Sequence, residues 1–95
     1  MVLNISKISG IGPYEVKSEP ECDLYYKNQL VFLVMHRNTI EVRCDQMLSE
    51  NLKAKYESVM ESRYYGKGGI EIVLAGQLSP TEIEDLIRLS YNITQ

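Results

Sequence analysis

Apolar and polar residues alternate at residues 14–17 and 39–44, with the period of two that is typical of β-strands, and two largely apolar or aromatic runs lie between them. The pattern predicts four strands, at residues 14–17, 22–27, 30–36 and 39–44. Glu19-Pro20-Glu21 follows the first strand, as an acidic turn or as a strand edge that Pro20 blocks from pairing. The short polar segments Asn28-Gln29 and Arg37-Asn38 favour tight turns, which join the last three strands in an antiparallel meander. Residues 30–35 are all apolar, so we expect this strand at the centre of the sheet, buried on both faces.

The second half of the chain changes to a helical period. Asp45 is suited to cap a helix over residues 46–56. The expected apolar stripe of this helix comprises Leu48, Leu52, Tyr56 and Val59. Residues 61–69 are polar and rich in glycine, which predicts a loop, and residues 70–74 form a further strand.

The segment Ser79-Pro80-Thr81-Glu82 is the clearest local signal in the chain. Ser79 can act as N-cap, Pro80 suits the first helical position, and Glu82 can complete a capping box. Apolar residues then recur at helical spacing as far as Tyr91, which predicts a helix over residues 80–93.

Strands followed by helices indicate an α+β fold. We expect an antiparallel sheet of four to five strands with two main helices packed on one face, in a single domain over residues 1–95. Residues 1–13 are predicted to form an N-terminal arm, in which Ile5, Ile8 and Ile11 are three residues apart, as in a short helix or 3₁₀ turn.

Composition narrows the class of protein. The net charge is −3, which disfavours a general attraction to phosphate without excluding a local basic patch. Residues 1–7 lack the features of a signal peptide and no apolar run is long enough to span a bilayer, so a cytoplasmic protein is expected. The spacing of Cys22 and Cys44 matches no zinc or redox motif; reduced thiols are expected there, although a disulfide between them stays open.

Several stretches resemble the MmcQ/YjbR family of small bacterial proteins with a CyaY-like fold. They are Thr39-Ile40-Glu41-Val42-Arg43-Cys44-Asp45, Arg63-Tyr64-Tyr65-Gly66-Lys67-Gly68-Gly69, Ile70-Glu71-Ile72-Val73-Leu74-Ala75-Gly76-Gln77-Leu78-Ser79 and Leu86-Ile87-Arg88-Leu89-Ser90-Tyr91. The resemblance covers about two thirds of the chain and implies DNA binding through paired wing-like elements. Two features depart from the family: residues 1–13 stand in place of a longer first helix, and Gly68-Gly69 stands where the family tends to carry His-Trp.

Residues 63–69 are the strongest candidate for a functional segment, because aromatic rings beside cations suit contact with nucleic acid. The candidate DNA-binding residues are Arg63, Tyr64, Tyr65 and Lys67, together with Lys27 and Arg37 near the two predicted turns. The alternative is that residues 63–69 are a flexible connection whose tyrosines pack on the sheet edge. The Gly-Lys-Ser/Thr spacing of a P-loop is absent from this segment.

The other polar groups favour structural roles. His36 has no partner nucleophile in a recognisable motif, and the acidic clusters Glu19-Glu21-Asp23 and Glu82-Glu84-Asp85 are expected to be solvated. Ser90 and Tyr91 are expected to pack the last helix against the sheet. The sequence therefore predicts a non-enzymatic protein with no metal, cofactor or small-molecule substrate. DNA binding through residues 63–69 is the main functional hypothesis, and a protein-interaction or homodimerisation module is the alternative.

Overall fold

The computed structural model describes residues 3–95, so the part of the predicted arm formed by Met1 and Val2 lies outside the described residues. Six strands and two α-helices follow a short 3₁₀ helix. Their bounds are η1 Ile5–Lys7, β1 Glu15–Ser18, β2 Asp23–Lys27, β3 Leu30–Met35, β4 Thr39–Arg43, α1 Gln46–Lys55, β5 Val59–Ser62, β6 Gly66–Val73 and α2 Pro80–Ile93. None of the helices within residues 3–95 has the length and apolar character needed to cross a membrane.

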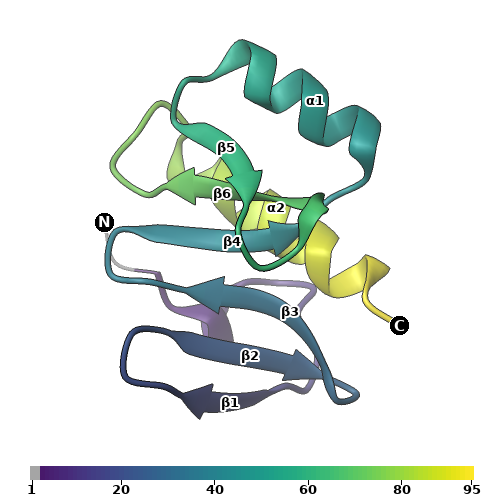
Figure 1. Cartoon of the computed structure of the whole chain (residues 1–95). Helices are drawn as coiled ribbons and strands as arrows, with labels where there is room; N and C mark the ends of the chain where they lie inside the picture. Colours follow the sequence, from purple (N-terminus) through teal and green to yellow (C-terminus); the bar gives the residue numbers. More distant parts are fainter. Residues whose placement is uncertain (1–2) are drawn as a thin grey trace.

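The strands form a single antiparallel sheet in the order β1-β2-β3-β4-β6-β5 (Figure 1). The α+β prediction is confirmed, with six strands in place of the four to five expected. The first four strands make a meander joined by short turns. Asn28 and Gln29, between β2 and β3, both adopt positive φ, as the predicted tight hairpin requires.

The predicted loop over residues 61–69 is wrong, because most of it is a β-hairpin. Strand β5 occupies Val59–Ser62 and β6 begins at Gly66, so only residues 63–65 form the turn. Val59, expected on the stripe of the first helix, is a buried residue of β5. The first half of β6 contains three glycines, which have low strand propensity, and the sequence pattern therefore predicted a loop there. Gly69 is needed there, since a Cβ atom would lie 2.5 Å from the Val42 carbonyl oxygen and 2.8 Å from the Tyr65 side chain.

Both helices begin where the sequence predicts. The Asp45 carboxylate accepts a hydrogen bond from the Leu48 N–H at 2.9 Å, which caps α1. Ser79 and Glu82 form the complete capping box of α2, with distances of 3.2 and 3.0 Å. The predicted role of Glu82 is thus a local one, at the start of its own helix.

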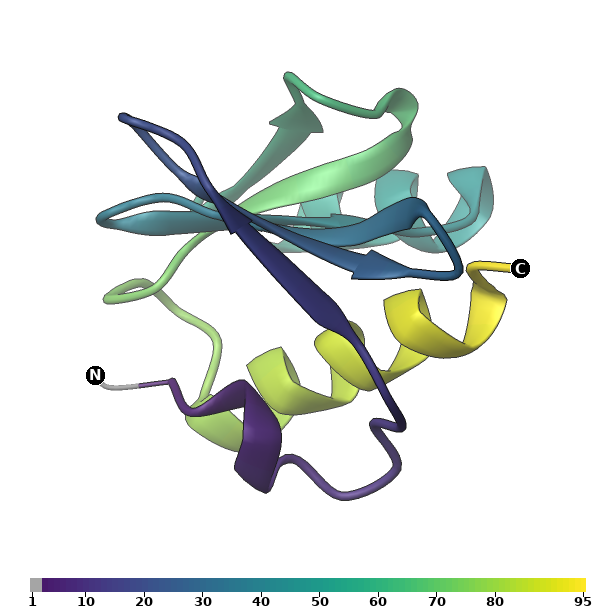
Figure 2. The ribbon, with the colours of Figure 1, turned by 90° about the horizontal axis from the view of Figure 1, so that it is seen from below.

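A single hydrophobic core lies between the helices and one face of the sheet (Figure 2). Ile83 and Ile87 of α2 are fully buried in this core. Leu48 of α1 is partly buried and packs against the same core. A β-bulge opposite Tyr25 and Tyr26 lets the consecutive residues Phe32 and Leu33 both enter the core. The remaining two buried residues of β3, Val31 and Val34, lie outside that core, so the strand is buried on both faces as predicted.

The N-terminal arm covers part of the core beside α2. Residues 5–7 form the 3₁₀ helix η1, and Ile5 and Ile8 are buried in the core cluster. Arg88 of α2 donates a hydrogen bond to the Ser9 carbonyl oxygen, and the Tyr91 hydroxyl donates one to the Pro13 carbonyl oxygen at 2.8 Å. Figure 2 shows the arm lying along the N-terminal half of α2.

Ser90 joins α2 to two strands through one buried hydroxyl. Its Oγ donates to the Phe32 carbonyl oxygen of β3 at 2.6 Å and accepts from the Arg43 N–H of β4 at 2.8 Å. The predicted packing role of Ser90 and Tyr91 agrees with these contacts, because the Tyr91 ring also meets the Phe32 ring edge-on at 5.0 Å.

Replacing Ser90 with alanine should lower the free energy of unfolding by about 2–4 kcal/mol, because a buried carbonyl and a buried N–H would both lose their partner. Ser79→Ala, which removes an exposed N-cap, is the matched control and should cost about 1 kcal/mol. Urea denaturation of both variants measures the difference. Equal losses would show that the Ser90 hydroxyl contributes no more than an ordinary cap.

Candidate functional site

The sheet face opposite the helices, here called the outer face, is defined by one row of paired residues that crosses all six strands. The row consists of Lys17, Leu24, Val34, Glu41, Glu71 and Met60, each paired with the next. Apolar residues occupy β2 and β3, whereas two glutamates face each other where β4 meets β6. The middle of the outer face therefore combines apolar and acidic groups.

Glu41 and Glu71 form an unusual pair for adjacent strands. They are direct cross-strand neighbours, and only 2% and 5% of their respective surfaces are exposed. Like charges opposite each other destabilise a sheet, and burying a carboxylate is costly unless it is paired. Both glutamates must therefore have strong compensating contacts.

Glu41 receives three hydrogen bonds. His36 Nε2 lies 2.5 Å from Glu41 Oε2, while the Ser62 hydroxyl at 2.7 Å and the Tyr64 N–H at 2.8 Å both donate to Oε1. Burial by itself raises the pKa of Glu41, but the hydrogen bonds from His36, Ser62 and the Tyr64 backbone outweigh it, so the pKa lies below its usual range. Glu41 is thus held as a carboxylate.

Glu71 is paired with a forked guanidinium. Arg63 donates from Nε to Oε1 at 2.9 Å and from Nη2 to Oε2 at 2.8 Å, and the Thr39 hydroxyl donates to Oε2 at 2.7 Å. Burial and the neighbouring charge of Glu41 raise the pKa of Glu71, yet the contacts with Arg63 and Thr39 lower it overall. The same pairing raises the pKa of Arg63.

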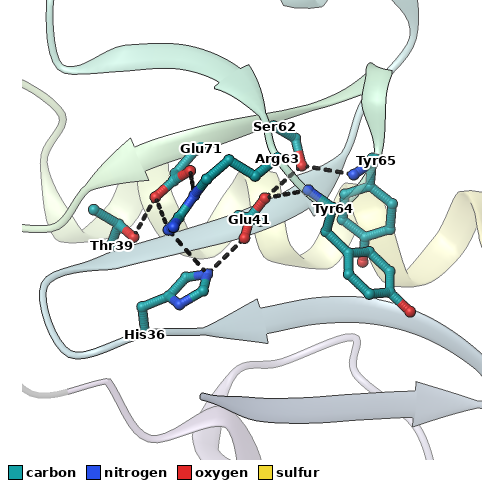
Figure 3. Close-up of polar contacts among 8 residues, drawn as sticks. All are labelled: His36, Thr39, Glu41, Ser62, Arg63, Tyr64, Tyr65 and Glu71. Carbon is teal, nitrogen blue, oxygen red and sulfur yellow. Dashed lines mark hydrogen bonds and ion pairs between the residues drawn. The ribbon is translucent and has the colours of Figure 1, made fainter. Parts of the chain in front are cut away.

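The two pairs meet at one point of the outer face (Figure 3). Arg63 Nη2 lies 3.5 Å from His36 Nε2, so the guanidinium reaches from Glu71 towards the imidazole. Figure 3 shows α2 behind the sheet while these side chains stand in front of it. One ligand-type atom from each of His36, Glu41 and Glu71 lies within 4.8 Å of the others, a spacing that one metal ion could bridge.

A shallow hollow of about 310 Å³ opens beside this network. Its lining includes Leu24 and Val34 as apolar walls, with His36, Glu41 and Arg63 on the polar side. Tyr64 stands at its rim with 52% of its surface exposed. A second hollow, of about 290 Å³, shares Cys22 and His36 with the first and is bordered by Glu19, Glu21, Asp23 and Arg37. The first predicted acidic cluster therefore lines a hollow beside Arg37.

The structure places two of the predicted DNA-binding residues side by side in the β5–β6 hairpin. Arg63 and Tyr64 are exposed neighbours in the turn between β5 and β6. Tyr65 points elsewhere, since its hydroxyl donates to the Val31 carbonyl oxygen at 3.0 Å and Arg43 stacks over its ring. Tyr65 is therefore a packing residue of the outer face.

The other three predicted cations lie apart. Lys67 is exposed in β6 beside Glu50 and Glu61. Lys27 donates to the Tyr91 carbonyl oxygen at 2.8 Å and lies over that ring, at the end of α2. Arg37 is exposed at the β3–β4 turn, beside the acidic hollow.

Sequence reasoning missed Glu41 and Glu71 as site residues. Each lies at the centre of an apolar–Glu–apolar triplet, Ile40-Glu41-Val42 and Ile70-Glu71-Ile72. Such triplets read as ordinary half-exposed strands, in which the polar residue faces water. The matching triplets were a usable signal, but only the pairing of β4 with β6 shows that the two carboxylates face each other.

Acid should lower the free energy of unfolding of this protein by protonating the two buried glutamates. Because the folded-state pKa values of Glu41 and Glu71 are lowered, their stabilisation is present above the unfolded value of about 4.3 and is lost as pH falls through the folded values. We expect the free energy of unfolding to fall steeply below about pH 4.3, and to do so less steeply in Glu71→Gln. Urea denaturation across the acid range measures both slopes, and identical slopes would contradict the assignment.

Comparisons with models of known protein families, with curated proteins and with solved structures found no match to this chain. The candidate site is accordingly defined by its own geometry. It consists of the glutamate pair with His36 and Arg63, the adjoining apolar hollow, and Tyr64 at the rim.

Proposed function

We propose that this chain is a non-enzymatic binding module of the MmcQ/YjbR type that associates with a second copy of itself through the outer face. The observation that carries the proposal is the apolar hollow with an exposed tyrosine at its rim. Buried aromatic anchors that fill pockets dominate the affinity of protein interfaces. In the proposed dimer, Tyr64 of one copy enters the hollow of the other.

Exposed apolar groups on this face support a protein partner. Besides Tyr64, Met60 of β5 is 42% exposed and belongs to the row that defines the outer face. Leu24 and Val34 form the walls of the hollow. Aromatic residues and methionine are enriched in protein interfaces.

The charges of the outer face are suited to self-association. Glu19, Glu21 and Asp23 lie at one side of the two joined hollows, and Arg63, whose side chain is 68% exposed, lies at the other. In a twofold dimer a surface of this kind can place the three acids of one copy near the Arg63 guanidinium of the other, which stays paired with its own Glu71.

The size of the molecule limits the strength of such a dimer. Its longest dimensions are 32 × 27 × 27 Å, so one whole face is comparable to the ~800 Å² that each partner buries in a standard interface. A dimer that uses only the middle of the face is therefore expected to be weak and concentration-dependent.

A DNA-binding module is the second candidate, favoured by one observation. Arg63 and Tyr64 are both exposed in the turn of the β5–β6 hairpin. We rank it second because Arg63 is engaged by Glu71, Lys27 by the Tyr91 carbonyl, and Arg37 lies beside three acids. Affinity for phosphate depends mainly on cations that are free to approach it.

Sedimentation equilibrium tests the dimer. The wild-type protein should show a reversible monomer–dimer equilibrium in the micromolar range, and Tyr64→Ser should weaken it at least tenfold, about 1.4 kcal/mol, because the anchor is lost. Met47→Ser is the control: it removes another large exposed side chain, 75% exposed and on α1, and should leave the monomer–dimer equilibrium unchanged.

The same preparations separate the two candidates. Fluorescence anisotropy with duplex and single-stranded DNA, at low and moderate salt, should detect no salt-dependent binding if the outer face serves a second copy. A strictly monomeric wild-type protein would refute the dimer. Salt-dependent DNA binding that is lost in Arg63→Gln would instead establish the DNA-binding module.

A further inference from the structure

We propose that His36, Glu41 and Glu71 form a binding site for a divalent first-row transition-metal ion, and that Arg63 is the cation with which the ion competes. The proposal does not depend on self-association. It assigns a chemical use to the two buried carboxylates beyond the stability of the sheet.

The three donors converge. One nitrogen or oxygen from each residue lies within 4.8 Å of the other two. Because metal–ligand bonds to nitrogen and oxygen are about 2.0–2.2 Å, two ligands on one ion lie up to roughly 4.3 Å apart, so small side-chain rotations bring all three into range. Glu41 and Glu71 come from paired strands, and His36 directly follows β3, so the sheet fixes their relative positions.

The charge of the site suits a dication better than a guanidinium. Two carboxylates carry two negative charges, whereas Arg63 supplies one positive charge to Glu71. Arg63 Nη2, 2.8 Å from Glu71 Oε2 and 3.5 Å from His36 Nε2, stands close to the position a bound ion would take.

Arg63 is able to leave without opening the core. It lies in the three-residue turn between β5 and β6, and 68% of its side chain is exposed. Glu71, in contrast, is fixed by Thr39, and Glu41 by Ser62 and the Tyr64 N–H. These outer contacts would orient the two carboxylates towards an ion after Arg63 has left, as the second shell does in metal proteins.

The donor set selects the class of ion. One imidazole nitrogen with two carboxylates suits Zn²⁺, Co²⁺, Mn²⁺ or Fe²⁺, whereas Ca²⁺ and Mg²⁺ prefer oxygen ligands alone. The hollow beside Leu24 and Val34 gives the ion a path from solvent and leaves coordination positions open to water.

Co²⁺ titration monitored by visible absorption is the direct test, with Zn²⁺ competition to measure affinity. Wild-type protein should bind Co²⁺ and show d–d absorption bands of cobalt with a nitrogen ligand. Arg63→Gln should bind Co²⁺ at least tenfold more tightly, because the competing guanidinium is gone. The double variant Arg63→Gln/Glu71→Gln should lose this gain. Arg37→Gln removes an exposed arginine beside the acidic hollow and serves as the matched control, with unchanged affinity.

A second measurement needs no substitution. Paramagnetic Co²⁺ should shift the NMR signals of the His36 ring more than those of Glu19, Glu21 and Asp23 in the folded wild-type protein. The proposal is overturned if wild type binds no Co²⁺ at millimolar concentration, if Arg63→Gln gains no affinity, or if the largest shifts appear at the acidic hollow.

Discussion

The outer face of this protein depends on one electrostatic constraint: two carboxylates on paired strands are buried opposite each other. Such a pair is unfavourable unless each charge has a close partner. His36 and Arg63 satisfy this requirement, and their positions determine much of what surrounds them. The β3–β4 turn must present the imidazole to Glu41, and the turn of the β5–β6 hairpin must direct the Arg63 guanidinium back to Glu71 of β6. The adjoining hollow and the exposed position of Tyr64 follow from the same arrangement.

The opposite face of the sheet packs against the helices through apolar side chains. Helix α2, with Ile83 and Ile87 in the core, packs on β3 and β4, and the Ser90 hydroxyl satisfies backbone groups of these two strands. No buried charge lies among the core residues within 3–95. The two faces of the sheet thus differ: the face towards the helices forms the apolar core, and the outer face carries the buried polar network.

Sequence patterns predicted the elements with local signals. The capping box at Ser79 and the Asn28-Gln29 turn are each decided by a few neighbouring residues. Strand β5 lacked such a signal, because two of its four residues are exposed and its partner strand begins with a glycine-rich segment. The site was harder still. The facing of Glu41 and Glu71 depends on a register between segments 30 residues apart, which alternation within either strand cannot reveal.

The sequence separation of the charge pairs has a consequence for the order of folding. His36 and Glu41 are five residues apart, within one hairpin, and Arg63 and Glu71 are eight apart, within another. Each carboxylate therefore acquires its closest side-chain partner from a short-range contact, which costs little loop entropy. The hydrogen bonds from Thr39 to Glu71 and from Ser62 to Glu41 then connect the β3–β4 and β5–β6 hairpins to each other. The partners that offset the repulsion between Glu41 and Glu71 are thus local in sequence, whereas the repulsion itself arises only when the two hairpins pair.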